Sequence, residues 1–199
     1  MMMFSSLSEA GGTEKDVYVI ARLNDRVQPL DRGNLYEDPL DEVLKQARVG
    51  SVTGGGTQLG EDNEVVFCDI EIQVTASLDD ATPLICSTLE SLGAPIGSKL
   101  ILESEDREVE LGKTEGLAVY LNGVDLPDHV YQECDFDTVS DEFTRLLGEE
   151  GKIHSYWQGP KETALYMYGP SFQEMKQRLD EFLVSYPLCQ QARVEQIAG

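Results

Sequence analysis

The runs VYVIARL at Val17–Leu23 and LAVYL at Leu117–Leu121 decide the fold of this 199-residue chain. Each is a short apolar stretch of the kind that forms a buried strand. After each come a polar loop, an amphipathic helical pattern, two strand-like runs, a second helical pattern and a last strand-like run. The sequence therefore predicts an internal duplication in which the order β-α-β-β-α-β occurs twice.

The first copy has recognisable start and stop signals. Asp38 precedes Pro39, and because proline suits the first position of a helix, we expect a helix to begin there. Residues 51–59 and 64–74 predict a hairpin, and Asp79 opens a second helix. Alternation places five apolar side chains on one face of the second hairpin strand: Val66, Cys68, Ile70, Ile72 and Val74.

The second copy repeats these signals. A helix is expected to begin at Asp137, which would act as its N-cap. Residues 152–158 and 163–168 predict the next two strands. Ser171 and Glu174 have the spacing of a capping box for the last helix, and residues 192–197 close the unit.

This order of elements resembles the ferredoxin-like, or split βαβ, fold. The resemblance implies an α+β protein with two tandem β-α-β-β-α-β repeats, each an antiparallel sheet with helices on one face. We expect a disordered leader over 1–13, the first repeat over 14–103, an acidic linker or hairpin over 104–114, and the second repeat over 115–199. A shared fold of this kind implies no particular function.

The charge of the chain is its most informative bulk property. The formal net charge is −22. Such a charge repels phosphate backbones and anionic lipids, so we expect neither nucleic-acid nor membrane binding. It would attract a basic protein, although solubility or adaptation to salt would also explain it. No signal peptide or membrane span is recognised, so we expect a cytoplasmic location. The four cysteines have no C-x-x-C spacing and are expected to be reduced.

A glycine cluster is the first candidate for binding. Gly54, Gly55, Gly56 and Thr57 form a possible ligand loop, because consecutive glycines allow backbone N–H groups to surround an anion. The lysine and the following helix of a phosphate-binding loop are missing, however. A bulged strand, or the close approach of another segment, is the alternative interpretation.

An acidic stretch from Asp125 to Glu142 is the second candidate. It contains seven carboxylates and no lysine or arginine. Helix capping accounts for some of these acids, and a solvated loop could account for others. A basic partner would relieve the repulsion among them. We therefore expect a partner-binding surface that includes Asp125, Asp128, Tyr131, Glu133 and Asp135.

Tyr156 and Trp157 are expected to contribute to the same surface. Neighbouring residues of a strand point to opposite faces of the sheet, so one of these two side chains must leave the core side. An exposed aromatic side chain is a common anchor in protein interfaces. The alternative is contact with the other repeat.

The sequence contains no recognisable catalytic arrangement. The two histidines, His129 and His154, do not form a metal-binding pair, and no serine or cysteine lies in a nucleophile motif. His154 is expected to be exposed or hydrogen-bonded. No metal site, cofactor or catalytic residue is therefore predicted.

These features favour an acidic protein-binding module rather than an enzyme. The chain resembles, in a general way, bacterial immunity proteins, which are small, acidic, cytoplasmic and free of catalytic motifs. That resemblance implies an inhibitor that occludes a basic toxin or enzyme. A pair of small-molecule sensor domains is the alternative, and an enzyme with a site between the halves comes third. The sequence leaves the oligomeric state open.

Overall fold

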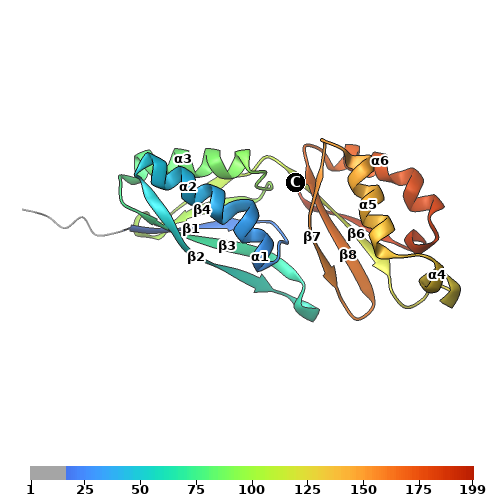
Figure 1. The fold of residues 1–199 in the computed structure, drawn as a ribbon. Coiled ribbons are helices and arrows are strands. Elements are labelled where there is room, and N and C mark those ends of the chain that lie inside the picture. Colours follow the sequence, from blue (N-terminus) through green and yellow to red (C-terminus); the bar gives the residue numbers. More distant parts are fainter. Residues whose placement is uncertain (1–16) are drawn as a thin grey trace, which may run out of the picture.

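The protein is built around two antiparallel β-sheets, one of five strands and one of four (Figure 1). The structure is a computed structural model that describes residues 17–199. The leader predicted for residues 1–13 lies outside the described residues.

Each sheet belongs to one half of the chain. The first half contains β1 (Val17–Leu23), α1 (Pro29–Arg32), a π-helical turn (Gly33–Glu37), α2 (Asp38–Ala47), β2 (Gly50–Leu59), β3 (Val65–Val74), α3 (Leu78–Ser91), β4 (Ser98–Leu102) and β5 (Arg107–Leu111). The second half contains β6 (Glu115–Asn122), α4 (Asp128–Glu133), α5 (Phe136–Leu147), β7 (Lys152–Gln158), β8 (Glu162–Gly169), α6 (Phe172–Ser185) and β9 (Arg193–Ala198).

The strand order is the same in the two halves. The first sheet runs β2-β3-β1-β4-β5 and the second runs β7-β8-β6-β9. In both, the first strand of the unit lies at the centre, between the third and the fourth strand. The predicted fold class, two tandem ferredoxin-like units, is therefore confirmed. Within the stretch 104–114, β5 adds a fifth strand to the first sheet by pairing with β4.

Two separate apolar cores lie between the sheets and their helices. In the first half, α2 and α3 cover one face of the sheet, and in the second half α5 and α6 do the same (Figure 1). Leu40 and Leu44 of α2 and Ile85 and Leu89 of α3 are buried against alternate residues of the strands. Phe143 of α5 occupies the corresponding core of the second half. The opposite face of each sheet carries no helix (Figure 1). Because side chains alternate along a strand, every second residue points to that face.

The first helical segment begins earlier than predicted. It starts at Pro29, and Asp38 and Pro39 lie inside a continuous helical path instead of at its start. Proline in a helix lacks the N–H of the usual hydrogen bond and crowds the preceding turn. The π-helical turn Gly33–Glu37 lies directly before it and widens that turn, so the chain passes Pro39 without a break.

Two further details differ from the sequence prediction. The N-cap of α5 is Asp135, which accepts a hydrogen bond from the Thr138 N–H at 2.6 Å, so the prediction of Asp137 was wrong. In β3, Val66 is 46% exposed instead of buried with Cys68. The pairing passes from Gln58↔Phe67 to Leu59↔Val65, so Val66 is the extra residue of a β-bulge. The predicted cap Ser171 does accept a hydrogen bond from the Glu174 N–H.

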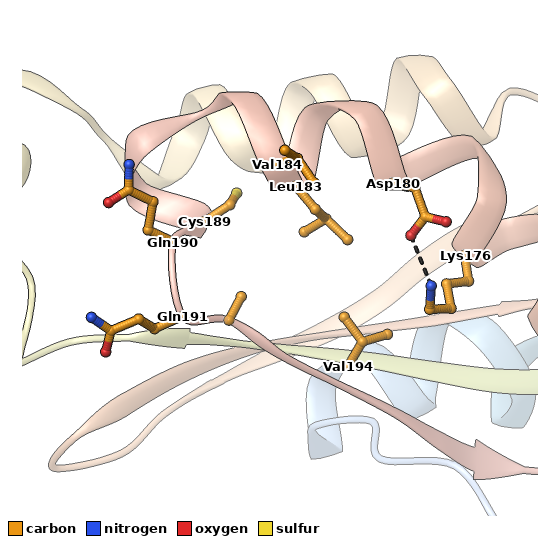
Figure 2. A pocket seen from close by; sticks show the side chains of 9 residues that line it. Lys176, Asp180, Leu183, Val184, Cys189, Gln190, Gln191 and Val194 are labelled. Carbon is orange, nitrogen blue, oxygen red and sulfur yellow. Dashed lines mark hydrogen bonds and ion pairs between the residues drawn. The ribbon is translucent and has the colours of Figure 1, made fainter.

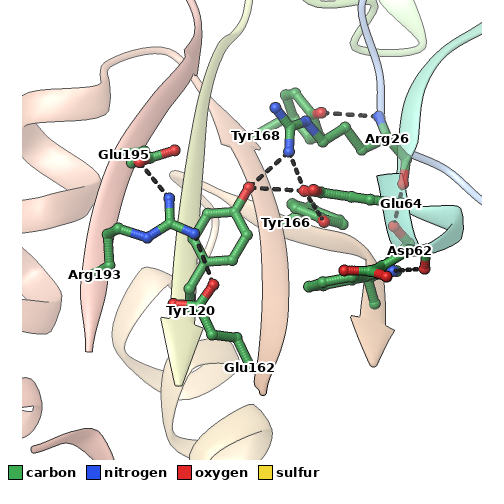
Figure 3. A network of polar contacts seen from close by, with 11 residues as sticks. Arg26, Asp62, Glu64, Tyr120, Glu162, Tyr166, Tyr168, Arg193 and Glu195 are labelled. Carbon is green, nitrogen blue, oxygen red and sulfur yellow. Dashed lines mark hydrogen bonds and ion pairs between the residues drawn. The ribbon is translucent and has the colours of Figure 1, made fainter. Parts of the chain in front are cut away.

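The helix-free face of the second sheet contacts the first half. Tyr120, Tyr166 and Tyr168 lie on this face and are almost fully buried. The loop after β1 and the tip of the β2–β3 hairpin cover them, as Figure 3 shows for Arg26 and Glu64. Among residues 17–199, no helix is long and apolar enough to cross a bilayer.

Candidate functional site

The acidic stretch forms an exposed surface along α4 and the start of α5. Asp125 lies in the loop after β6, Asp128 begins α4 and Glu133 ends it. The Asn122 side chain shapes this loop, because its Oδ1 accepts hydrogen bonds from the N–H groups of Val124 and Asp125, both at 2.9 Å. These elements therefore place the carboxylates in the loop after β6, in α4 and in the first turns of α5.

Most of these carboxylates have no nearby cation. Glu142 pairs with Arg145, which lowers the pKa of this glutamate, and the Thr138 N–H lowers the pKa of Asp135 by donating to its carboxylate. Within residues 17–199, the remaining acids of the stretch form no ion pair. They are Asp125, Asp128, Glu133, Asp137 and Asp141, and all five are exposed. The negative charge of this surface is thus largely uncompensated.

An aromatic groove borders the acidic surface. Its walls are Phe136 and Asp137 at the start of α5, Tyr156 and Gln158 of β7, and Thr163 of β8, and its volume is about 330 Å³. The rings of Phe136 and Tyr156 lie 5.6 Å apart between their centroids. Tyr156 is 57% exposed. Because β7 is an edge strand of its sheet, the groove opens beside an unpaired strand edge.

Tyr131 differs from the other predicted partner-binding residues. Its hydroxyl accepts a hydrogen bond from the Leu126 N–H at 2.9 Å and donates to the Asn122 carbonyl at 3.2 Å. The side chain is half-buried and packs against the second core. Tyr131 therefore fixes the loop that presents Asp125 instead of offering a free aromatic surface.

Trp157 also has an internal role. Its indole N–H donates to the Asp62 carbonyl in the β2–β3 hairpin at 3.1 Å, so the ring contacts the first half. Gly159 lies against this ring, and a Cβ added there would come within 2.0 Å of it. Tyr156 and Trp157 thus point to opposite sides, and only Tyr156 is left for the groove. Trp157 therefore makes the contact with the other repeat that the sequence left open as the alternative.

Packing explains the glycine cluster. Gly54, Gly55, Gly56 and Thr57 all lie in β2, with an irregular register between Val52 and Gly54. The buried Arg32 side chain crosses the strand at Gly55 and donates to the Gly56 carbonyl at 2.7 Å and to the Thr57 hydroxyl at 2.8 Å. A Cβ at Gly55 would come within 2.6 Å of the Asp69 carbonyl and of Glu37 Oε1.

The surroundings of this cluster do not suit an anion. The hollow beside Gly54, of about 270 Å³, is lined by the carboxylates of Glu37, Asp38 and Asp41. These charges would repel a phosphate. Within the described residues, no group of histidine, cysteine and carboxylate side chains is arranged to hold a metal ion. The possible ligand loop is therefore a strand shaped to receive Arg32.

A further hollow lies between α6 and β9 (Figure 2). Its volume is about 380 Å³, and Leu183, Cys189 and Val194 line its apolar side. The ion pair of Lys176 and Asp180, at 2.9 Å, borders it. Burial raises the pKa of the Cys189 thiol to about 12, so this cysteine is a poor nucleophile at neutral pH.

One cluster had no signal in the sequence. The imidazole of His154 lies 2.8 Å from the carboxylate of Asp25, 129 positions earlier in the chain. Tyr36 donates its hydroxyl hydrogen bond to the same carboxylate at 2.6 Å. Asp25 is completely buried at the junction of the two halves. Its place in a polar loop resembled that of any solvated acid, so sequence reasoning could not select it.

No family model and no curated protein matches the sequence. Among solved structures, an unknown protein from Galdieria sulphuraria is 16% identical, with 92% of this chain and 98% of that chain covered and a TM-score of 0.27. The first two RRM domains of the yeast poly(U) binding protein Pub1 are 12% identical, with 92% and 99% covered and a TM-score of 0.25. An anthrone oxidase-like protein is 13% identical, with 84% and 78% covered and a TM-score of 0.26. Likenesses this distant assign no function to the chain.

Proposed function

We propose that this protein binds a basic protein partner through the aromatic groove and the acidic surface around it. The observation that carries the proposal is the combination in one place of an aromatic pair, half-buried Phe136 and exposed Tyr156, with uncompensated carboxylates. Interfaces are typically anchored by aromatic side chains at their centre and surrounded by polar groups. The groove supplies the aromatic side chains, and the acidic stretch supplies the polar groups around them.

The charge of the whole chain supports the same proposal. A net charge of −22 steers a cationic molecule toward the protein over distances of about one Debye length, ~8–10 Å at physiological salt. Close to the surface, Asp137 and the acids of α4 would pair with lysine or arginine side chains of the partner. Steering of this kind mainly raises the association rate, whereas the aromatic contact slows dissociation.

We infer an inhibitor of the immunity-protein type as the biological form of this binding. Such a protein acts by covering the basic cleft of a toxin, for example a nuclease that binds phosphate groups. An inhibitor needs a stable folded surface and no chemistry of its own. A cytoplasmic location in a bacterial host would fit that role, because the toxin must be neutralised before it reaches its target.

A capture experiment with matched variants tests the proposal. The wild-type protein, Tyr156→Ala and Asp137→Asn would be immobilised and exposed to the lysate of the native host, and bound proteins identified by mass spectrometry. Glu181→Gln, which removes an exposed carboxylate from α6, serves as the control. We expect a basic protein to bind to the wild type and the control, and more weakly to the two groove variants.

Salt dependence gives the second readout. With the captured partner purified, its Kd should rise steeply between 50 and 500 mM salt, values chosen to shorten the Debye length about threefold. Asp137→Asn should flatten that dependence, and Glu181→Gln should leave it nearly unchanged. Equal capture by the wild type and by Tyr156→Ala, or an affinity independent of salt, would refute this mode of binding.

A further inference from the structure

The junction between the two halves contains a buried carboxylate with an unusual set of partners. Asp25, in the loop after β1, has no exposed surface. Its Oδ2 accepts a hydrogen bond from Tyr36 at 2.6 Å and contacts Nδ1 of His154 at 2.8 Å. Its Oδ1 is buried without a hydrogen-bond partner in the described residues. A buried carboxylate is costly unless its oxygens have hydrogen-bond partners, and Tyr36 and His154 both contact the same one of the two oxygens.

Irregular backbone segments place these groups at the junction. Tyr36 lies in the π-helical turn Gly33–Glu37, and His154 lies where the register of β7 shifts between Ile153 and Ser155. A β-bulge redirects a side chain, and both kinds of irregularity are frequent at functional sites. Here they direct an aromatic hydroxyl from one half and an imidazole from the other toward Asp25.

His154 retains one nitrogen for a ligand. Its side chain is only 6% exposed, and Nδ1 is occupied by Asp25. Nε2 makes no hydrogen bond within residues 17–199, yet it is not enclosed, because the ring borders a cavity of about 170 Å³. Tyr168 packs against the imidazole with the two rings tilted by 35°, with 4.7 Å between ring centroids, and forms another wall. An imidazole nitrogen that faces a small cavity can form a hydrogen bond with a polar ligand.

The rim of this cavity carries both signs of charge. Lys152, two residues before His154, lies on one side, and Glu149 and Glu150 lie in the loop that precedes β7. None of these three side chains forms an ion pair within the part of the chain that the structure describes. The first half closes the cavity with Gly93 and Thr114. A ligand that carried only a carboxylate would meet the two glutamates, and one that carried only an amine would meet Lys152.

We propose that the junction cavity binds a small zwitterion, of the chemical class of free amino acids. The carboxylate of the ligand pairs with Lys152, its ammonium group pairs with Glu149 or Glu150, and His154 Nε2 forms a hydrogen bond with the ligand. The volume of about 170 Å³ admits a molecule of this size. This site is separate from the aromatic groove and is independent of the proposed partner binding.

The contacts between the halves keep the site assembled. Arg26, next to Asp25, donates its backbone N–H to the Tyr168 hydroxyl at 3.0 Å and its guanidinium to the Tyr120 hydroxyl at 2.7 Å (Figure 3). Burial raises the pKa of Tyr168, so this wall of the cavity remains a neutral phenol. The cavity is therefore present before a ligand arrives, which limits the entropy lost on binding.

Thermal shift and calorimetry with defined probes test the proposal. The full chain would be titrated with glycine, alanine, serine and leucine, and with acetate, propionate, 4-methylpentanoate, methylamine, ethylamine and isopentylamine as analogues that lack one of the two charged groups. We expect at least one amino acid to raise the Tm in a concentration-dependent way. The acid and the amine matched to that amino acid should each bind at least about tenfold more weakly than the amino acid itself.

Variants locate the binding. His154→Gln should weaken amino-acid binding about tenfold, because one charged hydrogen bond is lost. Lys152→Ala, at an exposed position, tests the rim without disturbing the buried pair. His129→Gln removes the other histidine, which is exposed on α4, and should leave binding unchanged. Absence of a thermal shift with all four amino acids, or unchanged binding in both His154→Gln and Lys152→Ala, would overturn the proposal.

Discussion

The hydroxyl of Tyr166 in the second half donates a hydrogen bond of 2.6 Å to the carboxylate of Glu64 in the first half. The same Oε1 accepts a hydrogen bond from Tyr120 at 2.8 Å and forms an ion pair with Arg26. The carboxylate of Glu64, directly before β3, thus joins two tyrosines of the second half to Arg26 of the first half (Figure 3). Glu64 is therefore one of the residues that hold the two halves in a defined contact.

This arrangement predicts a large effect of Glu64→Ala on stability. The substitution leaves Arg26 and two tyrosine hydroxyls without their acceptor in a partly buried place. We expect the free energy of unfolding in urea to fall by about 2 kcal/mol, and a double-mutant cycle with Tyr166→Phe to give a coupling of about 1 kcal/mol. Glu61→Ala, an exposed residue of the same hairpin, is the control. Equal losses for Glu64→Ala and Glu61→Ala would contradict this role.

Neighbouring glycines of β2 should respond differently to the same substitution. At Gly55 a Cβ would meet the Asp69 carbonyl and Glu37 at 2.6 Å, whereas at Gly56 nothing lies within 4 Å. We expect Gly55→Ala to destabilise by about 1–3 kcal/mol through overpacking against Arg32 and Glu37. Gly56→Ala should be neutral or stabilise by about 0.5 kcal/mol, because it restricts the unfolded chain. Urea unfolding of the two variants checks this, and similar stabilities would show that Arg32 does not need Gly55.

The sequence predicted the repeat because its signals are local. Val17–Leu23 is an apolar run interrupted only by Arg22, and the strand has those same bounds. The buried faces of α3 and α6 follow from their helical spacing, and Ser171 caps α6 because hydroxyls commonly bind the first N–H groups of a helix. Repetition of these signals fixed the order of elements in both halves. The fold class needed no information on contacts between distant residues.

The features that were missed depend on such contacts. Pro39 suggested a helix start, but the π-helical turn before it lets the helix continue from Pro29, and no sequence rule predicts that turn. Asp25 and His154 meet only because the two halves pack together, with a bulge in β7 aiming the imidazole. Trp157 was expected to bind a partner, yet the first half uses its indole N–H. The charge pattern of the sequence was thus enough to select the acidic surface. Which aromatic side chain is free to bind a partner could only be decided from the contacts in the structure.

The cap of α5 should give the protein a specific response to acid. A hydrogen bond from the Thr138 N–H lowers the pKa of Asp135 in the folded state. A group with a lowered folded pKa adds stability above its unfolded pKa, and this contribution disappears as the pH falls through the folded value. Asp135→Ala should therefore lower the Tm at pH 7, and the difference from wild type should shrink below about pH 4.

A second substitution separates the cap from the charge. Asparagine also accepts the N–H hydrogen bond, so Asp135→Asn should retain most of the Tm at pH 7. Its Tm should depend less on acid than that of the wild type, because its side chain does not titrate. Thermal unfolding followed by circular dichroism at several pH values gives both comparisons. A loss in Asp135→Ala that stays constant from pH 7 to pH 3 would exclude the carboxylate as its source.

Substitutions of Tyr156 and Trp157 should separate the effect on partner binding from the effect on stability. Trp157→Ala removes the hydrogen bond to Asp62 and a ring that packs on the tyrosines of the second sheet, so we expect a loss of about 2–3 kcal/mol in the free energy of unfolding. Tyr156→Ala removes a side chain that is 57% exposed and should cost less than about 1 kcal/mol. Partner binding should show the reverse order once the variants are compared at a temperature where both are folded. If Trp157→Ala weakened binding more than Tyr156→Ala under those conditions, the interface would lie at the hairpin tip beside Asp62 instead of in the groove of Phe136 and Tyr156.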